Sequence, residues 1–273
     1  MTGLQLEQPE VSSKAYQVIR DFIYSEAGID LRESKQMLVS SRLNKRLRYY
    51  QLDSFDQYAE LLINNKGLER QIAIDLLTTN ETYCFREAEH FTTLKKLVLE
   101  DHPTERVFRL WSAASSSGEE AYSIAMVLDD FFGERGKWEI FGSDINSLVL
   151  EKAKKGLYQC LRIDAIPQDF LRKYCLKGGG EYEGFLLIDK KLQKKTSFSQ
   201  INLTKPLPEV GLFDVIFLRN VLIYFDAKTK ENIIRNLISK LRPKGLLFIG
   251  HSESLKSMDL PIDLIGPTTY RKR

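Results

Sequence analysis

The stretch Phe108-Arg-Leu-Trp-Ser-Ala-Ala-Ser-Ser-Ser-Gly-Glu-Glu120 decides the fold of this chain. An apolar run passes into small residues, Ser112 to Ser117, and Gly118 and two acids follow. From Ala121 to Phe132 the apolar residues recur with helical spacing. A strand that passes through small residues into a helix leaves room for a ligand against bare backbone. The sequence therefore predicts a strand, a tight turn and a helix, the first unit of an α/β sheet.

The acids Glu119 and Glu120 stand where a phosphate-binding loop has a Lys or free backbone amides. Two carboxylates at this helix start would repel a phosphate and attract a cation. S-adenosylmethionine, a nucleoside that carries an amino acid and a sulfonium, suits such a turn. The turn by itself is equally compatible with acids that only complement the helix dipole.

The next predicted strand runs from Trp138 to Asp144 and ends in an acid. In nucleotide-binding units the acid that ends the second strand accepts hydrogen bonds from the ribose hydroxyls. Asp144 follows Gly118 by 26 positions, close to the roughly 20 residues of such units. A helix is predicted from Asn146 to Lys155, with Gly156 as its stop.

A third buried strand is predicted from Phe213 to Leu218 and leads into Arg219 and Asn220, with Tyr224 just beyond. Polar groups and rings therefore follow this strand at the carboxyl edge of the predicted sheet. Ligands bind at that edge in open α/β sheets. Three strand ends that each carry ligand-type residues are difficult to explain by packing alone.

Together these segments make the chain similar to the chemotaxis receptor glutamate methyltransferases, the CheR family. The resemblance runs from about Ser13 to Leu255, in the family's order. Two departures are Ala121, where the family often has Pro, and Ser115, where many members have Cys or Ala. Neither change removes a ligand group. The matching stretches are Leu77-Thr-Thr-Asn-Glu-Thr-Tyr-Cys-Phe-Arg-Glu87, Trp111-Ser-Ala-Ala-Ser-Ser-Ser-Gly-Glu-Glu-Ala-Tyr-Ser123, Gly142-Ser-Asp-Ile-Asn146, Phe213-Asp-Val-Ile-Phe-Leu-Arg-Asn-Val-Leu-Ile-Tyr-Phe-Asp226 and Gly250-His-Ser-Glu253.

The resemblance implies an α/β fold, with a Rossmann-like sheet of the S-adenosylmethionine-dependent methyltransferases. It also implies an N-terminal all-helical substrate-docking domain at residues 1–76 and a linker that contacts the cofactor at 77–103. The methyltransferase domain is expected at 104–273, with a small antiparallel β-subdomain inserted at about 174–201. The implied activity transfers a methyl group from S-adenosylmethionine to glutamate side chains of bacterial chemoreceptors. The products are glutamyl methyl esters, which adjust chemotaxis adaptation, and S-adenosylhomocysteine.

The site residues are expected from the same comparison and from side-chain chemistry. Glu119 or Glu120 would hold the amino group of the cofactor and Asp144 its ribose. By resemblance, Arg86 faces the methionine end, although its segment also contains possible helix caps, Thr79 and Asn80. The full set expected to bind the cofactor is Asn80, Thr82, Arg86, Ala113, Glu119, Glu120, Asp144, Asn202, Leu203, Arg219 and Asn220.

The chemistry requires little acid–base catalysis, because a glutamate carboxylate is already ionised at neutral pH, with a reference pKa near 4.3. It can attack the sulfonium methyl directly when oxygen, methyl and sulfur are aligned. Arg86 and Tyr224 are the candidates for orienting the carboxylate. No metal site is expected, because the histidines are widely spaced in the sequence: His90, His102 and His251.

Composition is ordinary for a globular protein, with 43% hydrophobic and 28% charged residues. No apolar run approaches the roughly 20 residues of a membrane span, and Met1 to Glu10 has no signal-peptide pattern. Cys84, Cys160 and Cys175 show no paired or metal-type spacing. We therefore expect a reducing compartment, the cytoplasm. The net charge of +3 gives no argument for nucleic acid.

Residues 12–76 are predicted to be helical throughout, and they contain a basic stretch. Leu38, Leu43 and Leu47 are spaced like one buried helix face. The basic residues around them are Arg42, Lys45, Arg46 and Arg48. They are either a solvated helix face or a docking surface for an acidic partner. The resemblance favours docking, since the implied substrate is a receptor helix that carries glutamates.

Short strands are predicted at Phe185 to Ile188 and at Thr196 to Ile201, after the glycine-rich loop from Lys177 to Gly184. The resemblance implies the β-subdomain that, in some members, binds the C-terminal tail of the receptor. A plain hairpin is the alternative. The last residues, Thr268 to Arg273, either add an antiparallel strand to the sheet or fray.

Two other classes of function remain open at this stage. A small-molecule or nucleic-acid methyltransferase would have the same fold, since fold does not fix the substrate. A non-catalytic adapter would bind the cofactor without transferring its methyl group.

Overall fold

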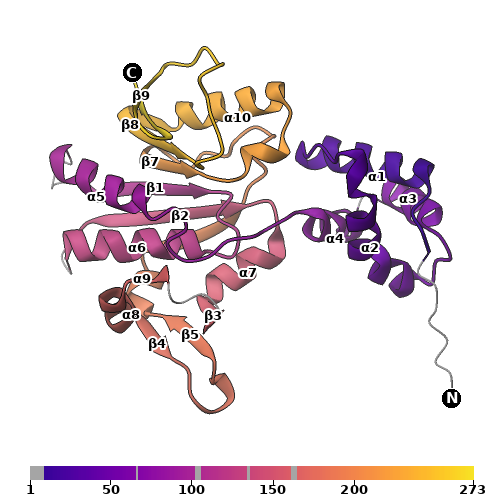
Figure 1. Ribbon diagram of the computed structural model, residues 1–273, viewed down its shortest axis with the longest axis horizontal. Coiled ribbons are helices and arrows are strands. Elements are labelled where there is room, and N and C mark those ends of the chain that lie inside the picture. The colour runs from indigo at the N-terminus through magenta and orange to yellow at the C-terminus, as the bar shows by residue number, and fades with distance from the viewer. Residues whose placement is uncertain (1–8, 66, 102–105, 134–135, 161–164) are drawn as a thin grey trace. The chain divides into compact units, whose positions relative to one another are not determined.

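The computed structural model describes residues 9–65, 67–101, 106–133, 136–160 and 165–273. The chain forms two compact units (Figure 1). The smaller unit comprises Met1–Thr79 together with Tyr224–Thr229. The larger comprises Asn80–Ile223 and Lys230–Arg273.

The smaller unit is helical, as the sequence predicts. Ser12 and Ser54 cap two of its helices, each accepting a backbone N–H of the first turn. Leu38 is only half-buried, so its assignment to the buried face was wrong; Val39 replaces it, four residues before Leu43. The helices are α1 (Ser13–Ala27), a 3₁₀ turn (Glu33–Lys35), α2 (Gln36–Tyr50), α3 (Phe55–Asn64) and α4 (Leu68–Leu77).

The larger unit contains a mixed sheet that, within the described residues, has seven strands in the order β6-β2-β1-β7-β8-β10-β9. The strands from β6 to β8 are parallel, and β10 and β9 are antiparallel additions. The strands are β1 (Phe108–Ala113), β2 (Trp138–Asp144), β6 (Thr196–Gln200), β7 (Phe213–Leu218), β8 (Leu241–Ile249), β9 (Ile262–Gly266) and β10 (Thr269–Lys272). The three strands predicted around the site are confirmed, and the C-terminal residues form the antiparallel strand β10.

The helices of the larger unit follow the strands in the alternation that α/β folds require. The predicted helix after β1 is confirmed as α6 (Glu119–Phe132), and the one after β2 as α7 (Ser147–Lys155). Asn146 caps α7, and Gly156 ends it in the left-handed conformation. The other described helices are α5 (Glu89–Asp101), α8 (Gln168–Tyr174) and α9 (Lys190–Gln193). The 3₁₀ turn η4 (Leu222–Tyr224) begins and α10 (Ala227–Ser239) ends in the larger unit, but Tyr224–Thr229 belongs to the smaller unit.

Buried side chains run almost continuously along the central strands β1 and β7, because both faces of a parallel sheet are covered. Leu110, Val215 and Phe248 belong to one hydrophobic core with the buried side chains of α6. Their neighbours Trp111 and Ile216 are also fully buried. The core fixes the strand positions, and with them the carboxyl ends of the strands.

A small antiparallel sheet has the order β3-β5-β4 and lies below the large sheet in Figure 1. Its strands are β3 (Leu157–Gln159), β4 (Cys175–Lys177) and β5 (Phe185–Ile188), with a 3₁₀ turn (Gly180–Tyr182) between the last two. The predicted strand at Phe185 to Ile188 is therefore confirmed, as the centre of this sheet.

The expected extent of the inserted sheet, about 174–201, was wrong at both ends. β3 lies before residue 174, and β6 pairs in parallel with β2 as an edge of the large sheet. The physical reason is Gly142 on β2, which faces the Phe198 ring of β6. A Cβ at Gly142 would meet that ring at 2.5 Å. Phe198 also packs against Tyr122 of α6.

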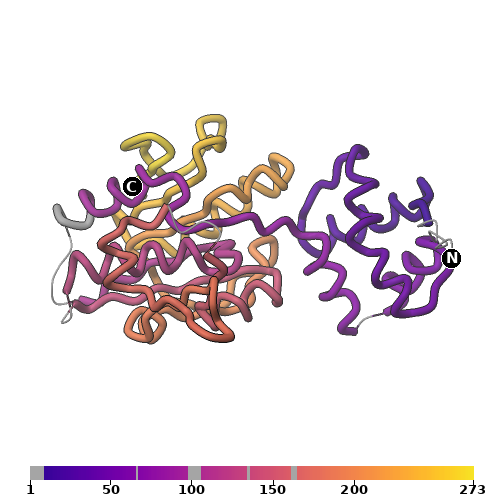
Figure 2. The backbone as a smooth tube through the Cα atoms, turned by 60° about the horizontal axis from the view of Figure 1, so that its bottom comes forward, coloured from indigo at the N-terminus to yellow at the C-terminus, as the bar shows by residue number. Residues whose placement is uncertain are grey.

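Between α4 and α5 the chain runs through residues 78–88 without a regular helix or strand, as the tube in Figure 2 traces. No helix in the described ranges is long and apolar enough to cross a membrane.

Candidate cofactor site

The loop between β1 and α6 has an unusual backbone. Ala114, Ser116 and Gly118 all have positive φ, at 60°, 49° and 94°. A Cβ at Gly118 would lie 2.8 Å from the Cβ of Ala153 and 3.0 Å from the Tyr158 hydroxyl. Only glycine therefore fits at the start of α6. The small residues of this loop expose the backbone at the carboxyl end of β1.

Asp144, at the end of β2, binds this loop. Its Oδ2 accepts a hydrogen bond from the Ser116 amide and its Oδ1 one from the Asn146 amide, both at 2.9 Å. Asn80 joins the same group, because its carbonyl accepts the Ser116 hydroxyl at 3.0 Å and its side chain accepts Asn146 Nδ2 at 2.9 Å. The first and second strand ends and the segment after α4 therefore meet at Asp144.

The two glutamates at the start of α6 have different partners. Glu120 accepts the Ser112 hydroxyl at 2.7 Å and Arg219 Nη1 at 2.9 Å. Glu119 accepts the Ser117 hydroxyl at 2.7 Å instead. Burial raises the pKa of Glu119. Of the two acids, Glu120 is therefore the one that contacts the residue following β7.

The end of β7 carries Arg219, whose side chain is 2% exposed. Besides Glu120, its guanidinium donates to Glu87 Oε2 at 2.8 Å and to the Arg86 carbonyl at 2.5 Å. Asn220 has a φ of 58° and donates from its side chain to Glu87 Oε1 at 3.0 Å. Burial alone would raise the pKa of Glu87, but the hydrogen bonds from Asn220 and Arg219 outweigh it and lower the pKa to about 2.

Glu253, in the turn after β8, binds the backbone after β7. Its carboxylate accepts the amides of Asn220, Leu222 and Gly250 at 3.0, 2.8 and 2.7 Å. Burial raises its pKa, although these amides act in the opposite direction. Neither Glu87 nor Glu253 was singled out from the sequence, although both lie in the motifs quoted for the family resemblance.

His90 and His251, which are widely spaced in the sequence, lie close together in the fold. Their ring centroids are 4.7 Å apart, and ligand-type atoms of Glu87, His90 and His251 all lie within 4.8 Å of one another. Both oxygens of Glu87 already accept hydrogen bonds from Asn220 and Arg219. The absence of a metal site stays a prediction. His102 lies outside the described residues.

His90 should make folding stability depend on pH. Burial and then the charge of Arg219 lower its pKa from 6.5 to about 4, against the opposing charge of Glu87; His251 also lowers it. The folded state therefore binds fewer protons, so this contribution is present above pH 6.5 and is lost as pH falls toward 4. We expect a loss of about 2 kcal/mol in unfolding free energy between pH 7 and pH 5.

Urea unfolding of the parent and of His90→Gln at both pH values measures this dependence. The variant should lack the pH-dependent stability that His90 provides between pH 7 and pH 5. Glu87 does not interfere, because its own contribution to stability is lost only at pH values below about 4.5. Identical pH profiles for the two proteins would contradict the assignment.

The remaining predicted residues lie as follows. Arg86 donates to the Glu81 carbonyl at 2.9 Å, and its guanidinium lies 5.8 Å from the Tyr83 ring centroid. Asn202 accepts the Thr204 amide at 3.0 Å, as expected for a loop Asn before a turn. The other positions are Ala113, buried at the end of β1, Leu203, buried in the loop after β6, and Tyr224, at the end of η4 in the smaller unit.

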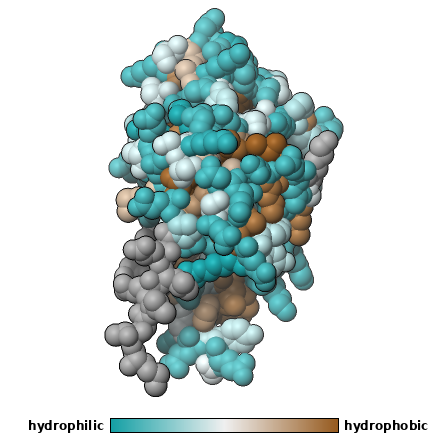
Figure 3. Space-filling view, turned by 90° about the vertical axis from the view of Figure 1, so that its right-hand side faces the viewer, coloured by the Kyte–Doolittle hydropathy of each residue, from teal (hydrophilic) through white to brown (hydrophobic). Residues whose placement is uncertain are grey.

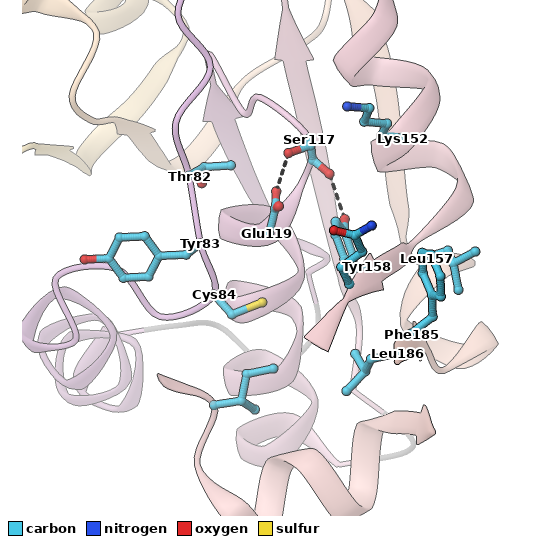
Figure 4. A pocket seen from close by; sticks show the side chains of 12 residues that line it. Thr82, Tyr83, Cys84, Ser117, Glu119, Lys152, Leu157, Tyr158, Phe185 and Leu186 are labelled. Carbon is cyan, nitrogen blue, oxygen red and sulfur yellow. Dashed lines mark hydrogen bonds between the residues drawn. The ribbon is translucent and has the colours of Figure 1, made fainter. Parts of the chain in front are cut away.

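A cavity of about 460 Å³ lies between the segment after α4, the start of α6 and the small sheet (Figure 4). Thr82 and Glu119 are the predicted site residues among its lining. In Figure 4 Ser117 links the Glu119 carboxylate to Tyr158, whose hydroxyl donates to the Ser117 carbonyl at 2.7 Å. Glu119 therefore faces this cavity, whereas Glu120 pairs with the end of β7.

Comparison with known proteins assigns both units. Residues 80–271 match the CheR methyltransferase SAM-binding domain. The chain belongs to the CheR methyltransferase family. Residues 14–78 match the all-alpha domain of CheR methyltransferases, which corresponds to the helices α1 to α4. The larger unit is thus an S-adenosylmethionine-binding domain.

Curated relatives of this CheR-family chain resemble it over nearly its whole length. The chemotaxis protein methyltransferase of Salmonella typhimurium is 41% identical over 98% of this chain and 93% of its own length. That of Escherichia coli K12 is also 41% identical, over 98% of this chain and 95% of its own. The chemotaxis protein methyltransferase 2 of Pseudomonas aeruginosa is 38% identical over 93% and 91% of the two chains.

The side chains at the strand ends fit the cofactor that the CheR domain binds. S-adenosylmethionine is a cation with ribose hydroxyls and an amino acid end. Carboxylates at Glu120 and Asp144 and the amide of Asn220 offer matching acceptors and donors. No cluster of basic groups that would favour a phosphate adjoins them among the contacts described above.

In the CheR all-alpha domain the four predicted docking residues divide into two pairs. Arg42 donates to the carbonyls of Leu77 and Thr78, both at 2.9 Å, at the end of α4. Arg46 pairs with the buried Glu69 at 2.5 Å. Lys45 and Arg48 are exposed.

Proposed function

We propose that the protein methylates glutamate side chains of bacterial chemoreceptors, with S-adenosylmethionine as methyl donor. The observation that carries this proposal is the match to chemotaxis protein methyltransferases along nearly the whole chain, helical domain included. The acids at the strand ends support it, because they suit a cationic cofactor. These relatives are named only as chemotaxis protein methyltransferases, and the receptor and its glutamates are the substrate that the family resemblance implies.

The proposed cofactor position uses the three strand ends. Asp144 accepts the ribose hydroxyls, and Glu120, rather than Glu119, binds the amino group. We choose Glu120 because it contacts Arg219, the residue next to Asn220 in the chain. The remaining proposed contacts are Ala113 near the loop, Asn80, Thr82 and Arg86 toward the methionine part, and Asn202 and Leu203 at the adenine. Arg219 was also expected to bind the cofactor, but its guanidinium is engaged by Glu87, Glu120 and the Arg86 carbonyl, so we propose that it acts through Glu120.

The reaction needs no proton transfer. When bound, the cofactor supplies an electrophilic methyl group on its sulfonium. The substrate carboxylate forms a new O–CH₃ bond as the S–CH₃ bond breaks, and the electron pair stays on sulfur in S-adenosylhomocysteine. Arg86 and Tyr224 orient the carboxylate, and a light contact is preferable because a strong ion pair would stabilise the ground state.

Transfer of labelled methyl to receptor-containing membranes tests the function. A base-labile label in the receptor band would establish a carboxyl methyl ester. Cofactor binding by calorimetry without such a label would reject the substrate. Label on a small molecule or nucleic acid would favour a methyltransferase of that other substrate class. No transfer to any acceptor would favour a non-catalytic adapter.

We expect the receptor to dock on α2 through Lys45 and Arg48, since both charges are exposed. The side of the molecule drawn in Figure 3 is mostly hydrophilic with apolar patches. On α2 itself, the apolar side chains of Met37 and Tyr49 are exposed as well. Changing Lys45 and Arg48 together to Glu should raise KM for receptor about tenfold at low salt, with kcat little changed.

Two comparisons check the docking prediction. The increase in KM should shrink as salt is added, because exposed charges are screened. Arg46→Glu serves as the contrast: it breaks the buried pair with Glu69 and should lower thermal stability first. An unchanged KM in the double variant would remove α2 as the docking surface.

The small sheet is the proposed binding site for a receptor tail. Among the described strands, the outer strands β3 and β4 each pair on one side only, and a free strand edge recruits an extended peptide by strand addition. Calorimetry with a tail pentapeptide that contains an aromatic residue should show binding. A flat titration would leave the sheet as a plain hairpin with an added strand.

A further inference from the structure

We propose that Glu87 is a positioning residue for the amino-acid end of S-adenosylmethionine, acting through Arg219 and Asn220. The proposal rests on the cofactor position described under the proposed function. Glu87 itself is not expected to contact the cofactor.

Glu87 contacts both side chains that follow β7, Arg219 and Asn220. Glu87 Oε2 accepts Arg219 Nη2 at 2.8 Å and Nε at 3.3 Å, and the opposite Nη1 of Arg219 donates to Glu120 at 2.9 Å. Glu87 Oε1 accepts the side chain of Asn220 at 3.0 Å. The backbone amide of His251 adds contacts of 3.3 Å to both oxygens. One carboxylate therefore sets the orientation of both side chains that end β7.

Arg219 is fully engaged by other groups of the protein. Its side chain is 2% exposed and donates to Glu87, Glu120 and the Arg86 carbonyl. A guanidinium so fully engaged acts by orienting Glu120 rather than by leaving to bind a ligand.

The net charge of this group of side chains is opposite to that of the cofactor. The connected carboxylates of Glu87 and Glu120 and the guanidinium of Arg219 have one excess negative charge. S-adenosylmethionine has an ammonium, a sulfonium and a carboxylate, and so one excess positive charge. Without the charge of Glu87, Arg219 would neutralise Glu120 and the attraction for the cationic cofactor would be lost.

The backbone supports the same arrangement. Asn220 is held at a φ of 58°, which is uncommon for a residue with a side chain. Glu253 fixes its amide, and Glu87 fixes its side chain. Two acids from distant parts of the sequence thus hold one residue in place.

The test compares two ligands that differ at the amino-acid end. S-adenosylhomocysteine has this end, and 5′-methylthioadenosine lacks it. In the full chain, Glu87→Gln should weaken S-adenosylhomocysteine binding about tenfold in calorimetry. This is the effect of losing one charge-assisted hydrogen bond, here the one from the ligand's amino group to a Glu120 that is no longer correctly oriented. The dissociation constant of methylthioadenosine should change by no more than about twofold. S-adenosylmethionine should lose at least as much.

The matched control is Asp214→Asn, at the other end of β7. Asp214 pairs with Arg106 at 2.6 Å and has a similar side-chain exposure, 11% against 15% for Glu87. It should leave the ratio of the two affinities unchanged. Glu87→Asp keeps the charge on a shorter side chain, so its ratio of the two affinities should lie between those of the parent and Glu87→Gln. If Glu87→Gln does not fold, the ratio in Glu87→Asp provides the test.

The outcomes separate the proposal from the function on which it rests. Equal weakening of both ligands would make Glu87 merely structural, and no weakening of either would remove its role. If the parent chain bound neither ligand, the proposed cofactor position would fail together with this inference. Normal binding by the parent with an unchanged ratio in both Glu87 variants would overturn the inference alone.

Discussion

Replacing Asp144 by alanine should weaken S-adenosylmethionine binding by about a hundredfold or more. A carboxylate that accepts two ribose hydroxyls makes charge-assisted bonds worth about 1.5–3 kcal/mol each. The loop would be affected as well, because Asp144 accepts the amides of Ser116 and Asn146. Isothermal calorimetry of the parent and the variant measures the change directly.

The control must separate ligand contacts from loop order. Asp144→Asn keeps the shape and one acceptor oxygen, so it should retain more of the loop structure and still lose affinity. Circular dichroism should show both variants folded. Equal cofactor affinity in Asp144→Ala and in the parent would overturn the proposed position of the ribose.

Replacing Tyr224 by phenylalanine should lower turnover by about a hundredfold with little change in cofactor affinity. A phenol hydroxyl that orients the attacking carboxylate affects alignment, and a misplacement of about 1 Å costs about a hundredfold in rate. Because the cofactor does not need that hydroxyl, its dissociation constant should stay within about twofold. Methyl transfer under saturating receptor and cofactor gives kcat.

Tyr24→Phe is the matched control for Tyr224. The Tyr24 hydroxyl donates to Asp226 at 2.5 Å, two positions beyond Tyr224 in the same unit. Its loss removes a phenol contact from the Tyr224–Thr229 segment without touching Tyr224 itself. A similar loss of turnover in both variants would point to disorder of the segment, and normal turnover in Tyr224→Phe would remove Tyr224 from the reaction.

The central sheet was predicted well because each of its strands is marked by a local pattern in the sequence. Trp138 to Asp144 and Phe213 to Leu218 are apolar runs with clear ends, and the structure has strands at the same residues. Gly156 stops α7 for a local reason too, its left-handed backbone. Features that depend on one short segment were therefore predictable.

Features that depend on a distant partner were not. Thr196 to Gln200 has the pattern of a short strand, but its position at the edge of the large sheet depends on Gly142, more than fifty residues earlier. The choice between Glu119 and Glu120 depends on Arg219. His251 meets Glu87 and His90 only through the fold. Side-chain neighbours of this kind leave no spacing signal in one sequence.

The return of the chain at Tyr224–Thr229 to the helical unit has a practical consequence for chimeras. Because the unit is made from two separate pieces of sequence, a cut after Thr79 would not release all of it. The transplanted piece would lack the Tyr224 carbonyl that accepts the Asp30 amide at 2.9 Å, and the Asp226 partner of Tyr24. A graft that exchanges receptor preference between relatives should therefore carry both pieces, and a protease nick between α4 and α5 should leave the two fragments associated.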